Sequence, residues 1–142
     1  MNLTIPVIGI PKGQPRARAF VRRGCKHAGV YDPGTADDWK SCVYLAARQA
    51  LLSAGFAGWP AGVPLMLSVT YRLPRPKRLG KRTMVPHTGK PDLDNLIKAT
   101  KDALSQAGVW HDDSQVACYR FAFKHYADRD DSTGASIAIE EV

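Results

Sequence analysis

The chain has 142 residues, 44% of them hydrophobic, and a formal net charge of +7. This length suits one domain with one hydrophobic core over residues 1–142, and no apolar run approaches the roughly 18 residues of a membrane span, so we expect no membrane partner. Because the start "MNLTIPVIGI" lacks signal-peptide features and the three cysteines are widely spaced, we expect a cytoplasmic protein with reduced thiols.

The first part of the chain combines predicted strands with positive charge. "LTIPVIGI" is β-branched and is followed by Pro11 and Gly13, which predicts a strand, and "ARAFVRR" is a candidate second strand. Residues 11–29 carry six basic side chains and no acidic one. Unneutralised like charge is destabilising unless a polyanion meets it, so this segment indicates a phosphate-facing surface. A solvated basic face without a ligand is the alternative.

A helix and a strand follow. Thr35 is a candidate N-cap for a helix that runs to about Ala54 and ends at Gly55. Its apolar residues recur at intervals of three and four, which predicts a buried face of Trp39, Val43, Ala46, Ala47, Ala50 and Leu51. Farther on, the strand formers of "VPLMLSVTYRL" predict a strand over about 63–73.

Residues 74–91 form a predicted loop of unusual length, with four prolines and two glycines. Long loops in compact domains are usually functional, and residues 72–90 carry seven basic side chains and no acidic one. We therefore expect a loop that contacts DNA, with a disordered linker as the alternative. The candidate DNA-binding residues of the two basic segments are Lys12, Arg16, Arg18, Arg75, Lys77, Arg78, Lys81, Arg82 and Lys90.

The last elements are a helix and two strands. An apolar stripe that includes Leu93, Leu96 and Leu104 predicts a helix over 93–107, which ends at Gly108. "SQVACYRFAFKHYA" and "GASIAIEEV" predict the final strands. This order of elements predicts an α+β fold, a small mixed sheet with two main helices packed on one face.

Two acidic clusters flank the last helix, "PDLD" at its start and "HDDS" after its end. Helix capping by Asp92, with Asp94 favoured by the helix dipole, is the structural explanation of the first cluster. Carboxylates are also the ligands of Mg²⁺, which could hold them together. Residues two apart on a helix point about 200° apart, so both aspartates can face one ion only if Asp92 is extended, as the preceding proline favours.

The stretch "HTGKPDLDNLIKATKDALSQAGVWHDDSQV", residues 87–116, closely resembles the core of the RusA-type endonucleases, Holliday-junction resolvases that are common in phages and prophages. The shared features are D-L-D-N-L, a lysine four residues after the second aspartate, "DAL" and D-D-x-Q. Elsewhere the resemblance is only architectural.

The resemblance implies an enzyme that holds Mg²⁺, with Mn²⁺ as an alternative, at Asp92, Asp94 and Asp113, and that uses Lys98 as a catalytic lysine. The neighbour Asp112 could be confused with Asp113. For Lys98 the alternative is an ion pair with Asp94 one helical turn away. We expect His87 and His111 to form local hydrogen bonds or to contact phosphate rather than to bind metal.

The resemblance also implies a homodimer acting on branched DNA, and a four-way junction needs two nicks related by a two-fold axis. A helix over 93–107 is about 22 Å long, whereas the steps from Gly108 to Asp113 span at most about 17 Å. Asp113 can therefore join Asp92 only if the helix is shorter or bent, or if Asp113 comes from the other subunit. We favour the first.

The function expected from these features is Mg²⁺-dependent junction resolution by paired symmetric nicks that leave 5′-phosphate ends, in DNA recombination and repair. A nuclease of the same fold acting on flaps or forks is one alternative. A non-catalytic DNA-binding protein, in which the aspartates only cap a helix, is another, and an RNA-directed nuclease is disfavoured by the resemblance alone.

Overall fold

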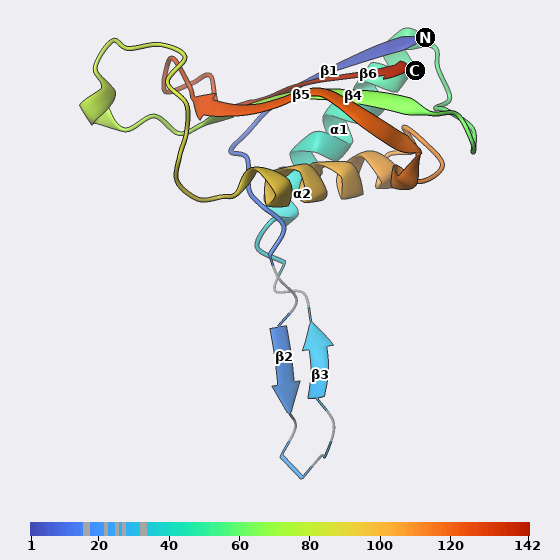
Figure 1. The fold of residues 1–142 in the computed structure, drawn as a ribbon, viewed down its shortest axis with the longest axis horizontal. Helices are drawn as coiled ribbons and strands as arrows, with labels where there is room; N and C mark the ends of the chain where they lie inside the picture. The colour runs from blue at the N-terminus through green and yellow to red at the C-terminus, as the bar shows by residue number, and fades with distance from the viewer. Residues whose placement is uncertain (16–17, 22, 25, 27, 32–33) are drawn as a thin grey trace.

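A computed structural model describes residues 1–15, 18–21, 23–24, 26, 28–31 and 34–142. Figure 1 shows one mixed sheet with both helices on the same face, and a separate hairpin that projects from that face. The sheet contains β1 (Asn2–Ile8), β4 (Leu65–Leu73), β5 (Val116–Tyr126) and β6 (Gly134–Glu141), in the spatial order β1-β6-β4-β5. The predicted α+β fold is confirmed.

Strand direction follows from the connections. β6 is antiparallel to both β1 and β4, whereas β4 and β5 are parallel. A parallel pair needs a crossover, and the helix between these two strands supplies it. β1 alternates buried and exposed residues, with Leu3, Ile5 and Val7 in the core. β1 and β5 are therefore the two edges of the sheet, and β5 is the longer.

Helix α1 (Asp37–Ala54) packs on β1 through the predicted stripe, and Trp39, Val43, Ala47 and Leu51 are buried. Ala46 and Ala50 are only partly buried. The expected cap at Thr35 is wrong, since Ala36 occupies the N-cap position and makes no side-chain hydrogen bond. Burial of the Ala36 side chain, 1% exposed, fixes the helix start instead. Gly55 ends the helix in the left-handed conformation, as predicted.

Helix α2 (Leu93–Gln106) packs against α1 and follows the predicted bounds to within one residue. Its buried Thr100 hydroxyl accepts hydrogen bonds from Trp39 Nε1 of α1 (3.3 Å) and from the Tyr71 hydroxyl of β4 (2.9 Å). Burial is also the main reason that the pKa of Tyr71 is raised. One side chain thus joins both helices to the sheet.

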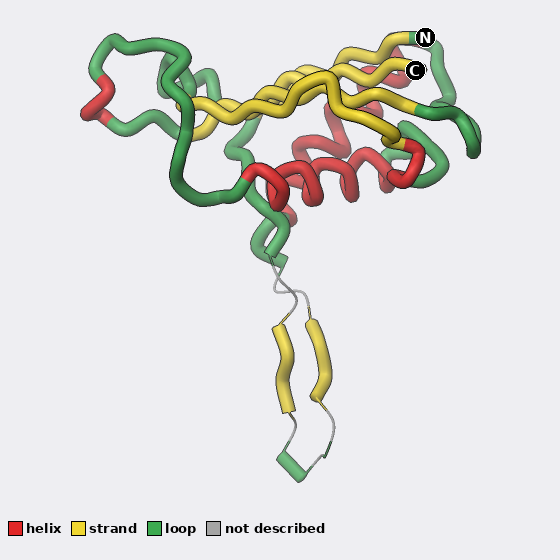
Figure 2. Tube along the Cα trace, in the orientation of Figure 1, coloured by secondary structure: helices red, strands yellow, loops and turns green. Residues whose placement is uncertain are grey.

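The projecting hairpin pairs β2 (Arg18–Val21) with β3 (Ala28–Tyr31), antiparallel, with Arg18 opposite Tyr31. Figure 2 shows that it stands apart from the main sheet. The predicted strand in "ARAFVRR" is confirmed, but its partner β3 was not predicted. Neither described helix combines the length and apolar character that crossing a membrane requires.

Candidate active site and nucleic-acid interface

The first acidic cluster lies where the chain turns into α2. Asp92 is the N-cap residue, extended with φ −68° and ψ 146°, and its side chain makes no capping hydrogen bond to the described backbone. Asp94 lies in the first helical turn, and both side chains are exposed. The prediction of an extended Asp92 is confirmed, whereas the capping bond that would explain this residue structurally is not formed. Its carboxylate oxygens therefore face solvent.

Lys124 of β5 fixes this segment to the sheet, which the sequence analysis missed. Its Nζ donates hydrogen bonds to the carbonyl oxygens of Gly89 (2.6 Å) and Pro91 (2.8 Å). The backbone N–H of His87 donates to the Lys124 carbonyl oxygen (3.1 Å). A lysine among the apolar residues of "FAFKHY" was the available signal. The segment before Asp92 is thus held by three hydrogen bonds to one residue of β5, Lys124.

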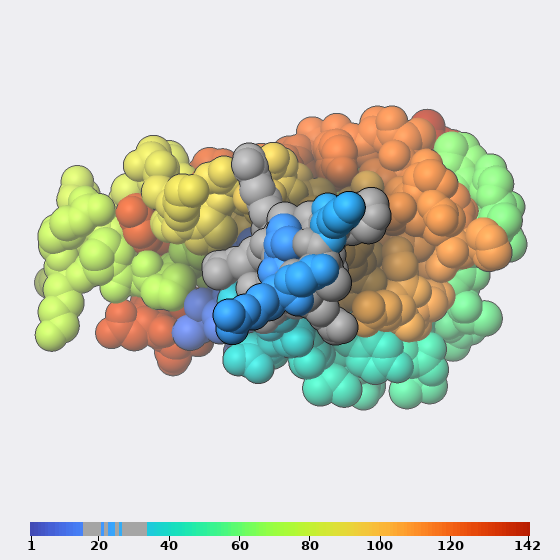
Figure 3. All heavy atoms as spheres, turned by 90° about the horizontal axis from the view of Figure 1, so that it is seen from below, coloured from blue at the N-terminus to red at the C-terminus, as the bar shows by residue number. Residues whose placement is uncertain are grey.

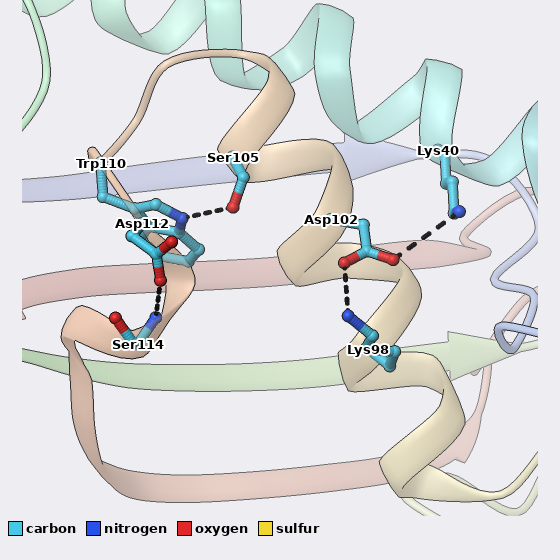
Figure 4. Close-up of polar contacts among 7 residues, drawn as sticks. All are labelled: Lys40, Lys98, Asp102, Ser105, Trp110, Asp112 and Ser114. Carbon is cyan, nitrogen blue, oxygen red and sulfur yellow. Dashed lines mark hydrogen bonds and ion pairs between the residues drawn. The ribbon is translucent and has the colours of Figure 1, made fainter.

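Lys98 lies one helical turn after Asp94, but its ammonium group forms an ion pair with Asp102, one turn farther along α2. Its Nζ is 2.8 Å from Asp102 Oδ1, and Lys40 of α1 is 3.8 Å from the other oxygen of the same carboxylate (Figure 4). The hydrogen bond to Asp102 is the main reason that the pKa of Lys98 is raised. The alternative of an ion pair with Asp94 is therefore wrong about the partner.

The two aspartates of the second acidic cluster have different structural roles. Asp112 caps the short 3-10 helix η2 (Asp113–Gln115), and its carboxylate accepts a hydrogen bond from the Ser114 backbone N–H at 2.8 Å (Figure 4). Hydrogen bonds from Ser114 also lower the pKa of Asp112. Gln115 Oε1 completes the capping box by accepting from the Asp112 N–H. The capping explanation thus holds for Asp112, which leaves Asp113 as the candidate ligand.

Asp113 shares a surface groove with Lys98. The groove has a volume of about 340 Å³ and is lined by Lys40, Lys98, Asp102, Ser105, Gln106, His111, Asp112 and Asp113. The negative charge of Asp113 also contributes to the raised pKa of Lys98. Neither Asp92 nor Asp94 lines this groove. Asp113 thus lies within electrostatic reach of Lys98, the residue one helical turn after Asp94.

The described residues contain no group of three histidine, cysteine, aspartate or glutamate side chains that could hold a metal. The preferred site within one chain, on a bent helix, stays a prediction, whereas α2 reaches Gln106, so the helix is not shorter than predicted. The apolar stripe explains this, because Ala103, Leu104 and Ala107 are all buried and hold the last turn in place. Asp92 and Asp113 consequently stay at opposite ends of α2.

The predicted DNA-binding residues differ in whether their charged groups are exposed or form contacts within the chain. In the loop 74–91, Lys77, Lys81 and Lys90 are exposed. Arg75 donates to the backbone carbonyl oxygens of Ala127, Gly80 and Arg82, so its guanidinium holds the loop in shape.

The remaining basic residues fall into three groups. Arg78 lies over the Tyr126 ring, 6.0 Å from its centroid, and Arg82 Nε donates to the Leu79 carbonyl oxygen. Lys12 makes only a long ion pair with Asp38, at 3.9 Å. Arg16 lies outside the described residues, and Arg18 is described only as part of the β2 backbone.

His87 lies between the basic loop and the sheet. Its ring packs on Tyr126 with centroids 4.8 Å apart, and its buried Nδ1 has no hydrogen-bond partner among the described residues. Burial, and then the Lys124 charge, lowers the pKa of His87. His111 is exposed and lines the groove of Asp113. Contact of either histidine with phosphate stays a prediction.

The chain is thus an α+β protein with a mixed sheet. It presents an exposed pair of aspartates next to a basic loop. A family model described as Endodeoxyribonuclease RusA matches residues 8–140, and the chain belongs to this family. YqaN of Bacillus subtilis, an uncharacterized protein, is 32% identical over 119 residues, which is 78% of each chain. The crossover junction endodeoxyribonucleases RusA of Enterobacteria phage 82 and Escherichia coli K12 are 46% identical over 48 residues, 34% of this chain and 40% of theirs.

Proposed function

We propose that this chain is a Mg²⁺-dependent endodeoxyribonuclease that resolves four-way DNA junctions as a homodimer. The observation that carries the proposal is the exposed pair Asp92 and Asp94, with Asp92 extended and uncapped, in a chain of the RusA family. The matched relatives of phage 82 and Escherichia coli are crossover junction endodeoxyribonucleases by name.

The donor set fits a hard divalent cation. Mg²⁺ and Mn²⁺ take oxygen ligands, usually one or two carboxylates together with water and substrate phosphate. Asp92 and Asp94 present exposed carboxylates from a segment that Lys124 holds in place. When bound, the ion would supply a water activated for attack on the phosphodiester and would stabilise the departing oxygen, leaving 5′-phosphate and 3′-hydroxyl ends.

Lys98 supplies positive charge beside the metal-binding segment. Without DNA it is paired with Asp102, and its side chain remains 58% exposed. A phosphate that enters the site competes with Asp102 for the ammonium group. In this proposal Lys98 neutralises negative charge that develops on the scissile phosphate. Asp102 holds the lysine near the helix surface until that happens.

The third ligand, Asp113, comes from the other subunit. Within one chain the described residues hold no three-membered ligand group, and Asp113 lies at the opposite end of α2 from Asp92. A two-fold axis can place the end of one subunit beside the start of the other. A composite site would also make cleavage depend on the dimer that paired nicks require.

DNA approaches from the face that carries the helices. The hairpin lies in front of this face in the view from below (Figure 3), and the loop 74–91, with its exposed lysines, leads into the start of α2. These lysines and the basic residues of the hairpin segment would contact the two backbones. Binding of this kind weakens steeply as salt rises, because bound phosphates release their counterions.

The substitution Asp94→Asn tests the nuclease assignment. It removes a ligand charge without changing side-chain size, so Mg²⁺-dependent cleavage of a synthetic four-way junction should fall by about 10² or more. Asp112→Asn is the matched control, because Asp112 caps η2, and this variant should still cleave. Cleavage by Asp94→Asn at the wild-type rate would overturn the metal assignment.

Comparing substrates separates the remaining functions. Junction, flap, fork, linear duplex and RNA substrates are offered to the wild type in one assay with Mg²⁺ or Mn²⁺. Fast cleavage of the junction alone supports the proposal, and faster cleavage of flaps or forks replaces it with a related nuclease. Junction binding without cleavage in either metal would show a DNA-binding protein.

Mixing two inactive variants tests the composite site. Asp94→Asn keeps Asp113, and Asp113→Asn keeps Asp92 and Asp94. If the third ligand crosses the dimer, a mixed dimer has one complete site and one site that lacks both groups. Refolding the two variants together should therefore restore nicking of one strand, while each variant alone stays inactive. If every site lies within one chain, no activity returns.

A further inference from the structure

The two edges of the sheet differ in their capacity to pair with another strand. β1 carries Pro6 at its centre, opposite Ser136 of β6, and proline has no N–H to donate to a further strand. β5 has eleven residues and no proline. An open edge of this length is a template for strand pairing unless something blocks it. β1 is blocked by Pro6, whereas β5 is interrupted only by register shifts at Ala117 and Arg120.

Part of the β5 edge is already covered. The Tyr126 N–H donates to the Val85 carbonyl oxygen (2.9 Å), and the Lys124 carbonyl oxygen accepts from His87. No described residue pairs with the outer edge of β5 from 116 to 123. The side chains of this stretch are unusually apolar for a surface, with Tyr119 45% exposed and Phe121 51% exposed. A free, apolar edge segment of about eight residues remains.

Two features of this edge segment affect how it would pair with the same segment of a second copy. The register between β4 and β5 skips Ala117 and Arg120, so β5 is irregular and bends there. Such irregularities limit the length of any ladder, which leaves the packing of Tyr119 and Phe121 to supply much of the contact. The charge of Arg120 is neutralised in its own chain by Glu140, at 2.7 Å.

We propose that this edge pairs antiparallel with the same edge of a second copy, centred near Arg120, and forms the homodimer. Antiparallel pairing of a strand with itself generates a two-fold axis perpendicular to the sheet, so the helices of both copies stay on the same face. This proposal rests on the proposed function for the identity of the partner. It extends that function by naming the interface.

The position of the active-site segments supports this pairing. η2, which holds Asp113, leads directly into the start of β5 at Val116. The segment before Asp92 is tied to the other end of the same strand, at Lys124. Pairing centred near residue 120 sets Phe123, the last residue of the free edge, opposite Ala117 of the partner subunit, so Lys124 follows directly after the paired stretch. Each aspartate pair then lies beside the partner's η2, on the shared helix face.

Single cysteines test the interface without using activity. In a background with Cys25, Cys42 and Cys118 replaced by serine, one cysteine is placed at Tyr119, Arg120 or Phe121, and Thr4→Cys on β1 is the control. We expect oxidation to give covalent dimers from the β5 positions and none from Thr4→Cys. Cross-linking at Thr4→Cys with none at β5 would overturn the proposal.

A charged variant gives a second readout. Phe121→Lys sets two positive charges close together at the pairing edge, which should raise the dimer dissociation constant by at least about tenfold. Leu52→Lys is the matched control, because Leu52 is 71% exposed on α1, away from β5. Sedimentation velocity measures both. A dimer of Phe121→Lys as stable as that of the control would also overturn the interface.

The interface and the nuclease function can fail separately. Cross-linked dimers without junction cleavage would support the proposed interface and contradict the proposed nuclease function. Restored nicking in the mixed Asp94→Asn and Asp113→Asn dimers, with no cross-link at β5, would support the enzyme and assign its dimer to another surface.

Discussion

The Lys124 ammonium group donates a hydrogen bond to the Pro91 carbonyl oxygen at 2.8 Å, and this contact joins an edge strand to the residue before Asp92. A second bond to Gly89 fixes the direction of the segment. The lysine touches no carboxylate of the acidic pair. Its effect on the pair is therefore exerted through backbone position, in the way that outer groups orient metal ligands.

Replacing Lys124 by methionine keeps the length of the side chain and removes both hydrogen bonds. We expect the Mg²⁺ concentration for half-maximal cleavage to rise by about 10- to 100-fold, because the aspartates lose a fixed orientation. Titrating Mg²⁺ in a cleavage assay measures the shift, and circular dichroism checks that the fold is kept. An unchanged metal requirement in a folded variant would show that Lys124 does not position the site.

Lys98→Met removes a positive charge one helical turn after Asp94. We expect kcat to fall by about 10²-fold or more with little change in junction affinity, because one of many phosphate contacts is lost while the stabilisation of developing charge is lost entirely. Single-turnover cleavage at saturating enzyme separates the two. An equal loss in affinity and no loss in the single-turnover rate would make Lys98 a binding residue only.

The Lys98–Asp102 pair also has a pH signature. Because the pKa of Lys98 is raised in the folded state, its stabilisation is fully present below the ordinary lysine value of 10.5 and is lost as pH rises past the folded value. The pair is exposed, so its contribution is only about 0.3–0.5 kcal/mol. Denaturant unfolding of wild type and Asp102→Asn should differ at neutral pH and converge once the pH exceeds the raised pKa of Lys98. A difference that persists at high pH would indicate another cause.

Thr100→Val is predicted to be the most informative change in the core. It keeps the shape of the side chain but removes the acceptor for two buried donors, Trp39 Nε1 and the Tyr71 hydroxyl. An unpaired buried donor costs about 1–3 kcal/mol, so the free energy of unfolding should fall by about 2–4 kcal/mol. Urea unfolding measures this. Tyr71→Phe in the same background should recover part of the loss, since one orphaned donor is then absent.

Two basic residues of the loop 74–91 should respond differently to substitution. Lys81 is exposed, so Lys81→Ala should weaken junction binding and reduce the slope of log affinity against log salt by about one. Arg75 holds three backbone carbonyl oxygens. Arg75→Ala should therefore lower protection of the loop from proteolysis as well as binding. Equal effects of both variants on proteolysis would contradict the structural role of Arg75.

Local patterns were sufficient to predict both helices and most strands. The periodicity of α2 gave its bounds to within one residue, and Gly55 marked the end of α1. The start of α1 was mispredicted because the burial of Ala36 is a tertiary effect that outweighs the capping preference of Thr35. β3 was missed because "AGVY" is too short and too small in side-chain size to stand out as a strand.

The candidate site was predictable in its residues but not in its assembly. The motif identified the aspartates and Lys98, and Asp92 is extended as the preceding proline indicated. The pairing of Lys98 with Asp102 rather than Asp94 was not predictable, because both lie one turn away on the same helix. Lys124 contacts Pro91 across 33 positions of sequence, a separation at which no local pattern carries information.

The place of β6 in the sheet has a consequence for biosynthesis. β6 lies between β1 and β4, so β1 has no partner strand in the sheet, and β4 is paired only with β5, until residues 134–141 have left the ribosome. A nascent chain that stalls before this point exposes two unpaired strand edges, which are targets for chaperones and proteases. β1 thus joins the sheet only after β6 has been synthesised, and chains that stall before β6 should be cleared rather than accumulate as partly folded protein.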